Sequence, residues 1–381
     1  MEFELSEEHR LVQRTVRDWA TARLLPLAAE MDRSSRYPPE LIRELGDLGL
    51  MGVFIPEEYG GGGMDTISYC IIMEEIARAE AAISAVLSVN NSLVCYPIFA
   101  FGDDRQKRHY LPDLARGRRI GCYCLTEPTA GSDAGSLAAT ARDAGDHWVL
   151  NGTKIFVTNG VEANVLIVYA RTEADPGSRG ISALIAEKGD PGLSVGKVEH
   201  KLGIRASSTC EIVLDECRIP KDRLLGQRGK GFHVALATLD GGRIGIAAQA
   251  LGIARAAMED ATAYAKERRQ FGRPIAAFQA TQWKIADMAT RIQAGRLLAY
   301  RAAWLRDQGR RHTREASMAK LFASETAMWA ATQAVQIFGG YGYIQEYPVE
   351  RHFRDAKITE IYEGTSEVQR MVIARQIMGA S

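Results

Sequence analysis

The sequence predicts an α+β protein with three domains in the order helical, β, helical. Apolar residues recur three and four apart from Ser6 to about Gly117, and again from about residue 229 to the end, which is the spacing of amphipathic helices. Between them, short β-branched and aromatic runs alternate with Gly, Pro, Asn and Asp, which is typical of strands and turns. We therefore expect an N-terminal helical domain (1–119), a middle β-barrel-like domain (120–228) and a C-terminal four-helix bundle (229–381).

Size and composition exclude several classes of protein. A chain of 381 residues with 46% apolar content is long enough for about two or three domains with real cores. Lys and Arg (47) balance Asp and Glu (47), so no overall field favours nucleic acid or an anionic membrane. No run approaches the roughly 18 consecutive apolar residues of a membrane span. The acidic N-terminus lacks a signal-peptide pattern, which predicts an intracellular protein, cytoplasmic in a bacterium or a processed form in the mitochondrial matrix.

The six cysteines are expected to be reduced, buried thiols. They are few for this length and lie mostly in apolar runs. Cys122-Tyr123-Cys124 is not a CxxC motif, and no neighbouring His or carboxylate completes a zinc set. We expect no metal site.

In the N-terminal domain, the helix boundaries follow from Pro and Gly. Tyr37-Pro38-Pro39 is expected to start a helix, and the glycines at 60–63 to form a flexible loop before the next one. Ile67–Arg78 and Ala81–Ala100 then read as buried helices rich in Ala, Ile and Val.

Six short runs are the expected strands of the middle domain. Asn151-Gly152 between two of them is a strong hairpin signal, because both central positions of a type I′ turn need positive φ. The expected strands are Cys122–Leu125, Trp148–Leu150, Lys154–Val157, Val165–Tyr169, Ile181–Ala186 and Ser208–Val213.

Four long, Ala-rich segments broken mainly by Gly are expected to form the C-terminal antiparallel bundle. They are Leu236–Arg269, Thr281–Gln308, Glu315–Phe338 and Ser366–Met378.

Glu363 is the foremost candidate for chemistry. It lies one residue before Gly364, which opens onto an amphipathic run, so we expect a turn into a helix. Ser366 and Gln369 have capping-box spacing, and Thr365 is an alternative cap. A carboxylate beside the free N–H groups of a helix start becomes a general base when a bound apolar ligand removes its water and raises its pKa. The alternative is a first-turn Glu that complements the helix dipole.

Two loops in the middle domain have the composition of a ligand cradle. The segment 125–133, LTEPTAGSD, places hydroxyls, a glycine and backbone donors between two strands, where they suit polar ring edges or phosphate oxygens. In the segment 154–160, KIFVTNG, Phe156 and Thr158 share one face of a strand, which suits a flat heteroaromatic ring. Taken singly, the first segment is better explained as an ordinary polar turn, whereas a core Phe beside a turn Thr explains the second equally well.

Three C-terminal motifs also have binding potential. Asp240-Gly241-Gly242-Arg243 combines an acid and a base with room for close approach, and the segment 268–272, RRQFG, suits pyrophosphate and adenine. The segment 336–342, QIFGGYG, ends a helix in glycines against which a ligand can lie. Salt-bridged helix faces and a C-cap remain alternatives. No glycine cluster forms a G-x-G-x-x-G unit after a strand, so a Rossmann dehydrogenase is not expected.

Taken together, these motifs resemble the acyl-CoA dehydrogenase family, most closely its short-chain (butyryl-CoA) branch. The resemblance covers essentially the whole chain in the same order. It is carried by LTEPTAGSDA, NGTKIFVTNG, KLGIRASST, LDGGRIGIAAQALGIA, ERRQFGRP, QIFGGYGY and RDAKITEIYEGTSEVQR.

The resemblance implies an FAD enzyme that oxidises an acyl-CoA thioester to its trans-2-enoyl-CoA and passes electrons to electron-transfer flavoprotein. It identifies Glu363 with the base that removes the α-proton while the β-hydrogen leaves as hydride to flavin N5. In the family, the thioester oxygen is held by the N–H of the base and by a flavin hydroxyl. Some FAD contacts come from a neighbouring subunit, which implies a homotetramer.

The remaining site residues follow from the same resemblance. Many relatives have Trp where this chain has Phe156. The implied FAD contacts are Tyr123, Cys124, Leu125, Thr126, Gly131, Ser132, Phe156, Val157, Thr158, Arg268, Phe271, Gln279, Gln336, Ile337, Phe338, Gly339, Gly340, Thr365, Ser366 and Glu367; the implied substrate contacts are Ser132, Asp240, Gly241, Gly242, Arg243 and Gly364.

Two other functions compete with the dehydrogenase. An acyl-CoA oxidase would use the same fold but deliver electrons to oxygen, although the larger oxidases carry an additional C-terminal domain. A non-catalytic helical scaffold with a vestigial site is the third reading. The presence of Glu363 and of both expected flavin loops argues against it.

Overall fold

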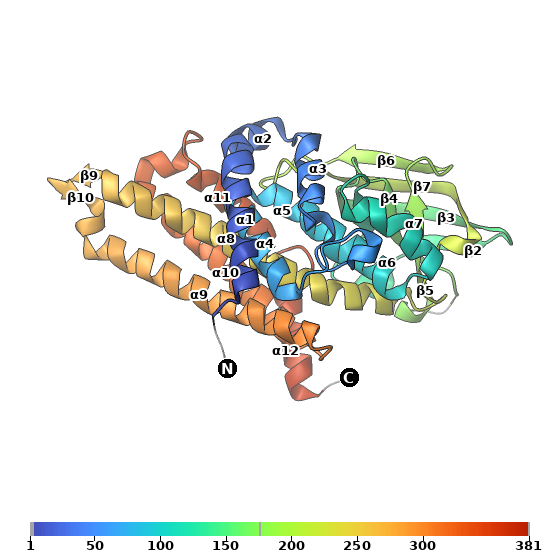
Figure 1. The fold of residues 1–381 in the computed structure, drawn as a ribbon. Helices are drawn as coiled ribbons and strands as arrows, with labels where there is room; N and C mark the ends of the chain where they lie inside the picture. Colours follow the sequence, from blue (N-terminus) through green and yellow to red (C-terminus); the bar gives the residue numbers. More distant parts are fainter. Residues whose placement is uncertain (1–3, 175–176, 380–381) are drawn as a thin grey trace.

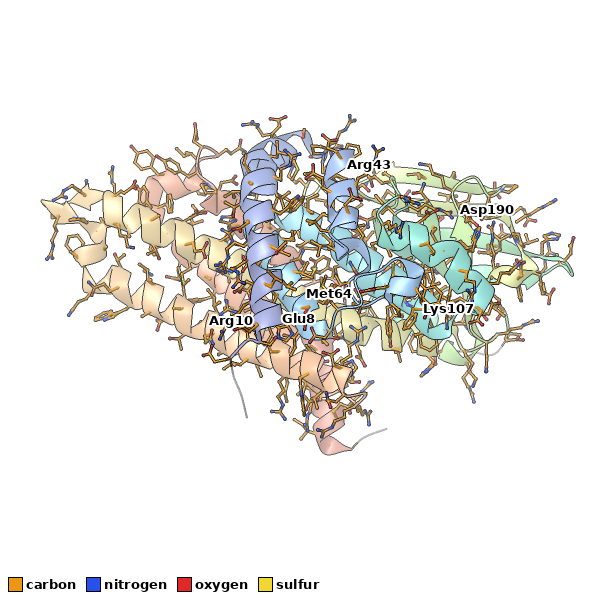
Figure 2. The ribbon with its side chains drawn as sticks, in the orientation of Figure 1. Glu8, Arg10, Arg43, Met64, Lys107 and Asp190 are labelled. Atoms are coloured by element: carbon orange, nitrogen blue, oxygen red, sulfur yellow. The ribbon has the colours of Figure 1, made fainter. Side chains whose placement is uncertain are left out.

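The computed structural model describes residues 4–174 and 177–379. The molecule is elongated, with the β-sheet at one end and a small β-hairpin at the other (Figure 1). The N-terminal helices lie across the middle, between these two ends. Exposed charged side chains of both signs alternate along the N-terminal helices, including Glu8, Arg10 and Arg43 (Figure 2).

The N-terminal domain is helical, as predicted. Pro39 is the first residue of α3, Asp65 caps α4 by accepting from Ser68 N at 2.7 Å, and Asp103 forms a capping box with Gln106 at the start of α7. The helices are α1 (Glu7–Trp19), α2 (Ala28–Ser34), α3 (Pro39–Asp47), α4 (Thr66–Ala79), α5 (Ala81–Ser88), α6 (Tyr96–Phe101) and α7 (Asp104–Ala115).

Residues 81–101 form one continuous helix, in which a π-helical segment (Val89–Cys95) joins α5 to α6. By length and composition alone this helix is apolar enough to cross a membrane, with a mean hydropathy of 1.4. A count of consecutive apolar residues does not detect this helix, because Ser, Asn and Pro interrupt its apolar residues. Of its apolar window, 89% is buried inside the protein, as in a core helix.

The middle domain is one eight-stranded sheet with the order β6-β7-β3-β2-β4-β5-β8, and β1 pairs with β4 in parallel. Within the described residues the end strands β6 and β8 do not pair, so the sheet is open and not a closed barrel. The strands are β1 (Gly121–Cys124), β2 (Thr140–Asp143), β3 (His147–Thr158), β4 (Val165–Arg171), β5 (Ile181–Glu187), β6 (Leu193–Val198), β7 (Thr209–Pro220) and β8 (Leu224–Leu225).

The hairpin predicted at Asn151-Gly152 is not formed. Both residues lie inside the single strand β3, where the register with β7 shifts between Leu150 and Gly152. Gly152 has φ +144°, and a Cβ there would lie 2.7 Å from Ala139 Cβ. The Asn-Gly signal therefore marks a bulge where a neighbouring segment approaches closely, and not a turn.

The C-terminal domain contains the four predicted helices, together with one helix and one hairpin that were not predicted. The predicted helices are α8 (Gly231–Glu267), α9 (Gln279–Asp307), α10 (Thr313–Phe338) and α12 (Ser366–Met378); the others are α11 (Val349–Ile358) and the hairpin of β9 (Arg269–Gln270) and β10 (Arg273–Pro274). Small alanines along α8 and α10 allow close packing of these two helices in the core.

The two helical domains share one hydrophobic core. Buried residues of α4 and α5 pack in the same cluster as those of α8, α9 and α10. Glycines on α8 allow this close approach, since a Cβ at Gly252 would lie 2.4 Å from Glu74 O of α4. Helix α8 also contacts strand β5, so it connects all three domains.

Candidate active site

Glu363 lies in the turn between α11 and α12, in a backbone conformation that is rare for a non-glycine residue. Its φ is +52°, and that of Gly364 is +95°. Thr365 caps α12, because its Oγ1 accepts from Val368 N at 3.3 Å. Of the two caps proposed from sequence, Thr365 is confirmed and Ser366 is wrong. Ser366 is the first helical residue, and its buried hydroxyl has no partner among the described residues.

The Glu363 carboxylate occupies a space that exists because residue 242 is glycine. A Cβ on Gly242 of α8 would lie 1.9 Å from Glu363 Oε2 and 3.2 Å from Leu93 Cδ2. Oε2 is buried and accepts no hydrogen bond from the described part of the chain. A buried carboxylate oxygen without a donor is costly in a folded protein, so this atom has the character of a functional group.

Burial raises the pKa of Glu363 from 4.5 to about 7, although nearby Lys320 and Arg243 lower it. Desolvation therefore outweighs the charges of Lys320 and Arg243. A carboxylate with a pKa near neutrality is well suited to general base catalysis.

Asp240 and Arg243 form an ion pair beside the carboxylate. Arg243 Nη1 donates to Asp240 Oδ1 at 2.7 Å, and Thr313 Oγ1 donates to Asp240 Oδ2 at 2.6 Å. The reading of this motif as a salt-bridged helix face is therefore correct. In the part of the chain that the structure describes, the arrangement also leaves Arg243 Nε buried without a partner, close to Glu363.

The main chain after Glu363 is held by side chains from two helices. Lys320 Nζ of α10 and Gln369 Nε2 of α12 each donate to Gly364 O at 2.8 Å, and Gln369 Nε2 also donates to Glu363 O at 3.2 Å. The main-chain N–H groups of Glu363 and Gly364 donate to no group in the described ranges. They remain available to bind an oxygen that develops negative charge.

The two loops proposed from sequence lie together and are joined by a buried ion pair. Lys154 Nζ contacts Glu127 Oε1 at 2.6 Å, and the same carboxylate accepts from Ala138 N at 2.6 Å and Ala139 N at 3.0 Å. Ile155 N donates to Thr126 O at 2.9 Å. The segment 125–133 is thereby fixed against β3 at Phe156, so both loops can contact one ligand.

Several groups beside these loops are open toward a ligand. Phe156 has φ +55° and is 63% exposed, an unusual combination for a bulky apolar residue. A Cβ on Gly131 would meet nothing within 4 Å. Among the described residues the buried hydroxyl of Tyr123 on β1 makes no hydrogen bond; burial raises its pKa, and the charge of Glu363 makes a smaller contribution. An exposed ring, an open loop and an unpaired hydroxyl fit a flat, polar-edged group such as the flavin of FAD.

The other residues proposed to bind FAD gather at the opposite end of α8. A cavity of about 420 Å³ lies there. Its lining comprises Tyr264, Arg268, Gln270, Ile275, Ile337, Phe338, Gly339, Gly340, Tyr341 and Ile344. Arg268, which ends α8, is 26 residues beyond Gly242, or about 39 Å along a helix. The proposed site residues therefore form two separate groups on one chain.

Sequence reasoning missed the groups that hold the site in place. Lys320 was not proposed. Gln369 was proposed only as a cap partner, and Glu127 and Lys154 appeared only within the loop segments, although all four residues are buried and polar. For Lys320, a lysine in the alanine-rich, apolar face of α10 was the available signal. The contacts of Lys320 with Gly364 and of Lys154 with Glu127 join residues that are far apart in sequence, so spacing gave no sign of them.

Comparison with protein families matches three consecutive models to almost the whole chain. They are acyl-CoA dehydrogenase, N-terminal domain (residues 6–118), middle domain (122–217) and C-terminal domain (229–378). The chain belongs to the acyl-CoA dehydrogenase family. Members of this family are FAD flavoproteins, and this acyl-CoA dehydrogenase catalyses the FAD-dependent dehydrogenation of an acyl-CoA.

Individual relatives of this acyl-CoA dehydrogenase match over nearly their full length. The acyl-CoA dehydrogenase of Bacillus subtilis is 51% identical over 99% of this chain and 100% of its own. The mitochondrial short-chain specific acyl-CoA dehydrogenase of Bos taurus is 50% identical over 98% of this chain and 91% of its own. The structure of butyryl-CoA dehydrogenase from Megasphaera elsdenii superimposes with a TM-score of 0.97, at 46% identity, covering 99% of this chain and 100% of that one.

Proposed function

We propose that Glu363 is the base that removes the α-proton of a short-chain acyl-CoA thioester in this acyl-CoA dehydrogenase. The observation that carries this proposal is the buried, unpartnered Oε2 in the space left by Gly242. Its pKa of about 7 means that roughly half of the molecules carry an ionised base at neutral pH. The carboxylate is also strong enough as a base to remove a proton activated by a thioester.

The chain's own residues would position the thioester for this step. The free N–H groups of Glu363 and Gly364 are donors for its carbonyl oxygen, where charge develops as the α-proton leaves. Asp240, Gly241, Gly242 and Arg243 provide the adjoining surface for the CoA portion, together with Ser132. Leu93, whose Cδ2 lies near the carboxylate, covers the acyl chain and excludes water from the base.

FAD would lie beside the two joined loops and would accept the β-hydrogen as hydride. The residues that would hold it on this side are Tyr123, Cys124, Leu125, Thr126, Gly131, Ser132, Phe156, Val157 and Thr158, with Thr365, Ser366 and Glu367. Phe156 takes the place of the Trp of many relatives. Its exposed ring supports a stacking contact with the flavin.

The distant group of residues supports the proposal of a homotetramer in which the FAD site is completed by another copy of the chain. This group comprises Arg268, Phe271, Gln279, Gln336, Ile337, Phe338, Gly339 and Gly340. Phe271 is at the tip of the β9–β10 hairpin, with φ +51° and 92% of its surface exposed. The strained, exposed ring supports a contact outside its own chain.

The short-chain preference and the electron acceptor are supported by relatives. The similarity to short-chain specific and butyryl-CoA dehydrogenases favours butyryl-CoA as the test substrate. Electron-transfer flavoprotein is the proposed acceptor. Bacterial and mitochondrial relatives are equally similar, so the proposed compartments remain the bacterial cytoplasm or the mitochondrial matrix.

The E363Q variant tests the assignment of the base. It keeps the size of the side chain, so we expect normal FAD binding and a loss of about 10³-fold or more in the rate of anaerobic flavin bleaching by butyryl-CoA. E360Q is the matched control, because Glu360 is three residues away and pairs with Lys357 at 2.6 Å. Bleaching of E363Q at the wild-type rate in a stopped-flow experiment would refute the proposal.

A further inference from the structure

Lys320 is a fully buried lysine whose contacts suggest a role in the reaction. It lies within α10, and its side chain has 0% exposure. Its Nζ donates to Gly364 O at 2.8 Å, next to the base. In the described ranges this is its only hydrogen bond, and it has no carboxylate in ion-pair contact. Burial lowers the pKa of Lys320 from 10.5 to about 8.

A buried ammonium without a contacting anion costs several kcal/mol unless nearby charge compensates for it. Glu363 provides that compensation, since it is the negative charge that raises the pKa of Lys320 most. The two groups do not touch, because Lys320 Nζ bonds to the carbonyl of the next residue. A direct ion pair would occupy the oxygen that must accept the proton, whereas a cation held at a distance favours the ionised form and leaves Oε2 free.

The other charges around Glu363 do not replace this cation. Arg243 of α8 is paired with Asp240 at 2.7 Å, so its charge is largely balanced. The other groups that interact with Glu363 are the phenols Tyr69 of α4, Tyr123 of β1 and Tyr362 of the same turn. Glu360 and Glu367 interact with Lys320. The buried guanidinium of Arg306 on α9 lies beside Gly241 and over the rings of Phe54 and Tyr96.

We infer that Lys320 is a positioning residue for proton abstraction, which fixes the turn at Gly364 and holds a positive charge beside the base without contacting it. This inference rests on the proposed role of Glu363. Lys320 acts through Glu363 and touches neither the substrate nor the cofactor. Its charge increases the ionised fraction of the base at neutral pH, and its hydrogen bond holds the left-handed conformation that aims the carboxylate at α8.

The structure offers a matched pair of variants that separate these two effects. K320M and Q369L each remove one donor to Gly364 O, but only K320M removes a charge. We expect Q369L to lower the rate of flavin reduction with the same pH midpoint as the wild type. We expect K320M to move the midpoint upward. If the pKa of Glu363 rises by about one, K320M loses about five-fold in rate at pH 7 and recovers above about pH 9.

The experiment measures anaerobic reduction of the FAD-loaded enzyme by butyryl-CoA from pH 6 to 9.5. K320R, which keeps the charge, should retain the wild-type midpoint. A second readout is the infrared band of the protonated Glu363 carboxyl, identified by its absence in E363Q and titrated in each variant without substrate. This band should persist to higher pH in K320M and not in Q369L.

Each outcome decides the inference. An unchanged midpoint in K320M, or the same upward shift in K320M, K320R and Q369L, would overturn it. If K320M does not fold, the inference is still tested by the infrared titration and the pH profile of K320R and Q369L. A shift of the pH midpoint in K320R but not in Q369L would contradict the role of the Lys320 charge. Wild-type bleaching in E363Q would instead refute the assigned base, which is a separate result.

Discussion

The space that Gly242 leaves for the Glu363 carboxylate predicts that the G242A variant loses activity without losing its fold. The added methyl carbon would lie 1.9 Å from Oε2 and 2.8 Å from Cδ of Glu363, whereas contacts below 3.0 Å are essentially never made. The obstructing group is the end of a flexible side chain, so the carboxylate must move by about 1 Å and α8 need not. Alanine also has the higher helix propensity, by up to about 1 kcal/mol.

A displacement of about 1 Å in a catalytic group can cost about 100-fold in rate, which corresponds to about 2.7 kcal/mol in activation free energy. We expect this loss in the stopped-flow rate of flavin bleaching by butyryl-CoA. The FAD content and the urea midpoint of unfolding should stay near wild-type values. These two measurements separate a displaced base from a damaged fold.

The matched comparison is G241A on the same turn of α8. Its Cβ would lie 3.1 Å from Arg306 Nη1 and would point away from the carboxylate. G241A should therefore be reduced much faster than G242A, with a similar gain in helix propensity. Reduction of G242A at the wild-type rate, or equal losses in the two variants, would show that the space at Gly242 does not position Glu363.

Three further predictions concern charge. The rate of flavin reduction should rise with pH to half its maximum near pH 7, since Glu363 must be ionised; a flat stopped-flow profile from pH 5 to 9 would contradict this. Because the folded-state pKa of Glu363 is raised, its contribution to stability is full below pH 4.5 and lost by about pH 7. Thermal melts should thus show E363Q more stable than the wild type at pH 8 and equal to it at pH 4, and equal melting temperatures at pH 8 would count against the raised pKa. K154M leaves Glu127 buried without its cation, which should reduce the free energy of unfolding by about 3–5 kcal/mol; an unchanged urea midpoint would exclude this.

The sequence predicted the helices well because their signals are local. The periodicity of α8 to α10 and the helix start at Pro39 depend on residues within one or two turns, and the observed helices agree. The hairpin prediction at Asn151-Gly152 was wrong because its outcome depends on contacts that are not local. Whether such a pair turns the chain or bulges a strand depends on Ala139 and β7, which pack against it from elsewhere in the sequence.

In the site, too, local features could be predicted from the sequence and features that depend on distant residues could not. The motif around Glu363 and the two glycines before Arg243 could be recognised from the local sequence. Its pKa could not be predicted, because burial comes from Leu93 and α8, and the opposing charge comes from Lys320 on a third element. The separation of the two groups of FAD residues also required the structure, since it follows from the length of α8.

Helix α8 has the reaction centre near one end and the exposed hairpin just beyond the other. In the middle of α8, Gly245 packs closely against Tyr69 of α4 and Gly252 packs closely against Glu74 of α4. These contacts with the N-terminal domain restrict bending of α8. In the proposed tetramer, a rigid α8 would fix the distance between Glu363 of one copy and the residues that the same copy contributes to the FAD site of a neighbouring copy. A larger residue at Gly245 or Gly252 would therefore disturb the active site of its own subunit and the FAD site of the neighbouring subunit.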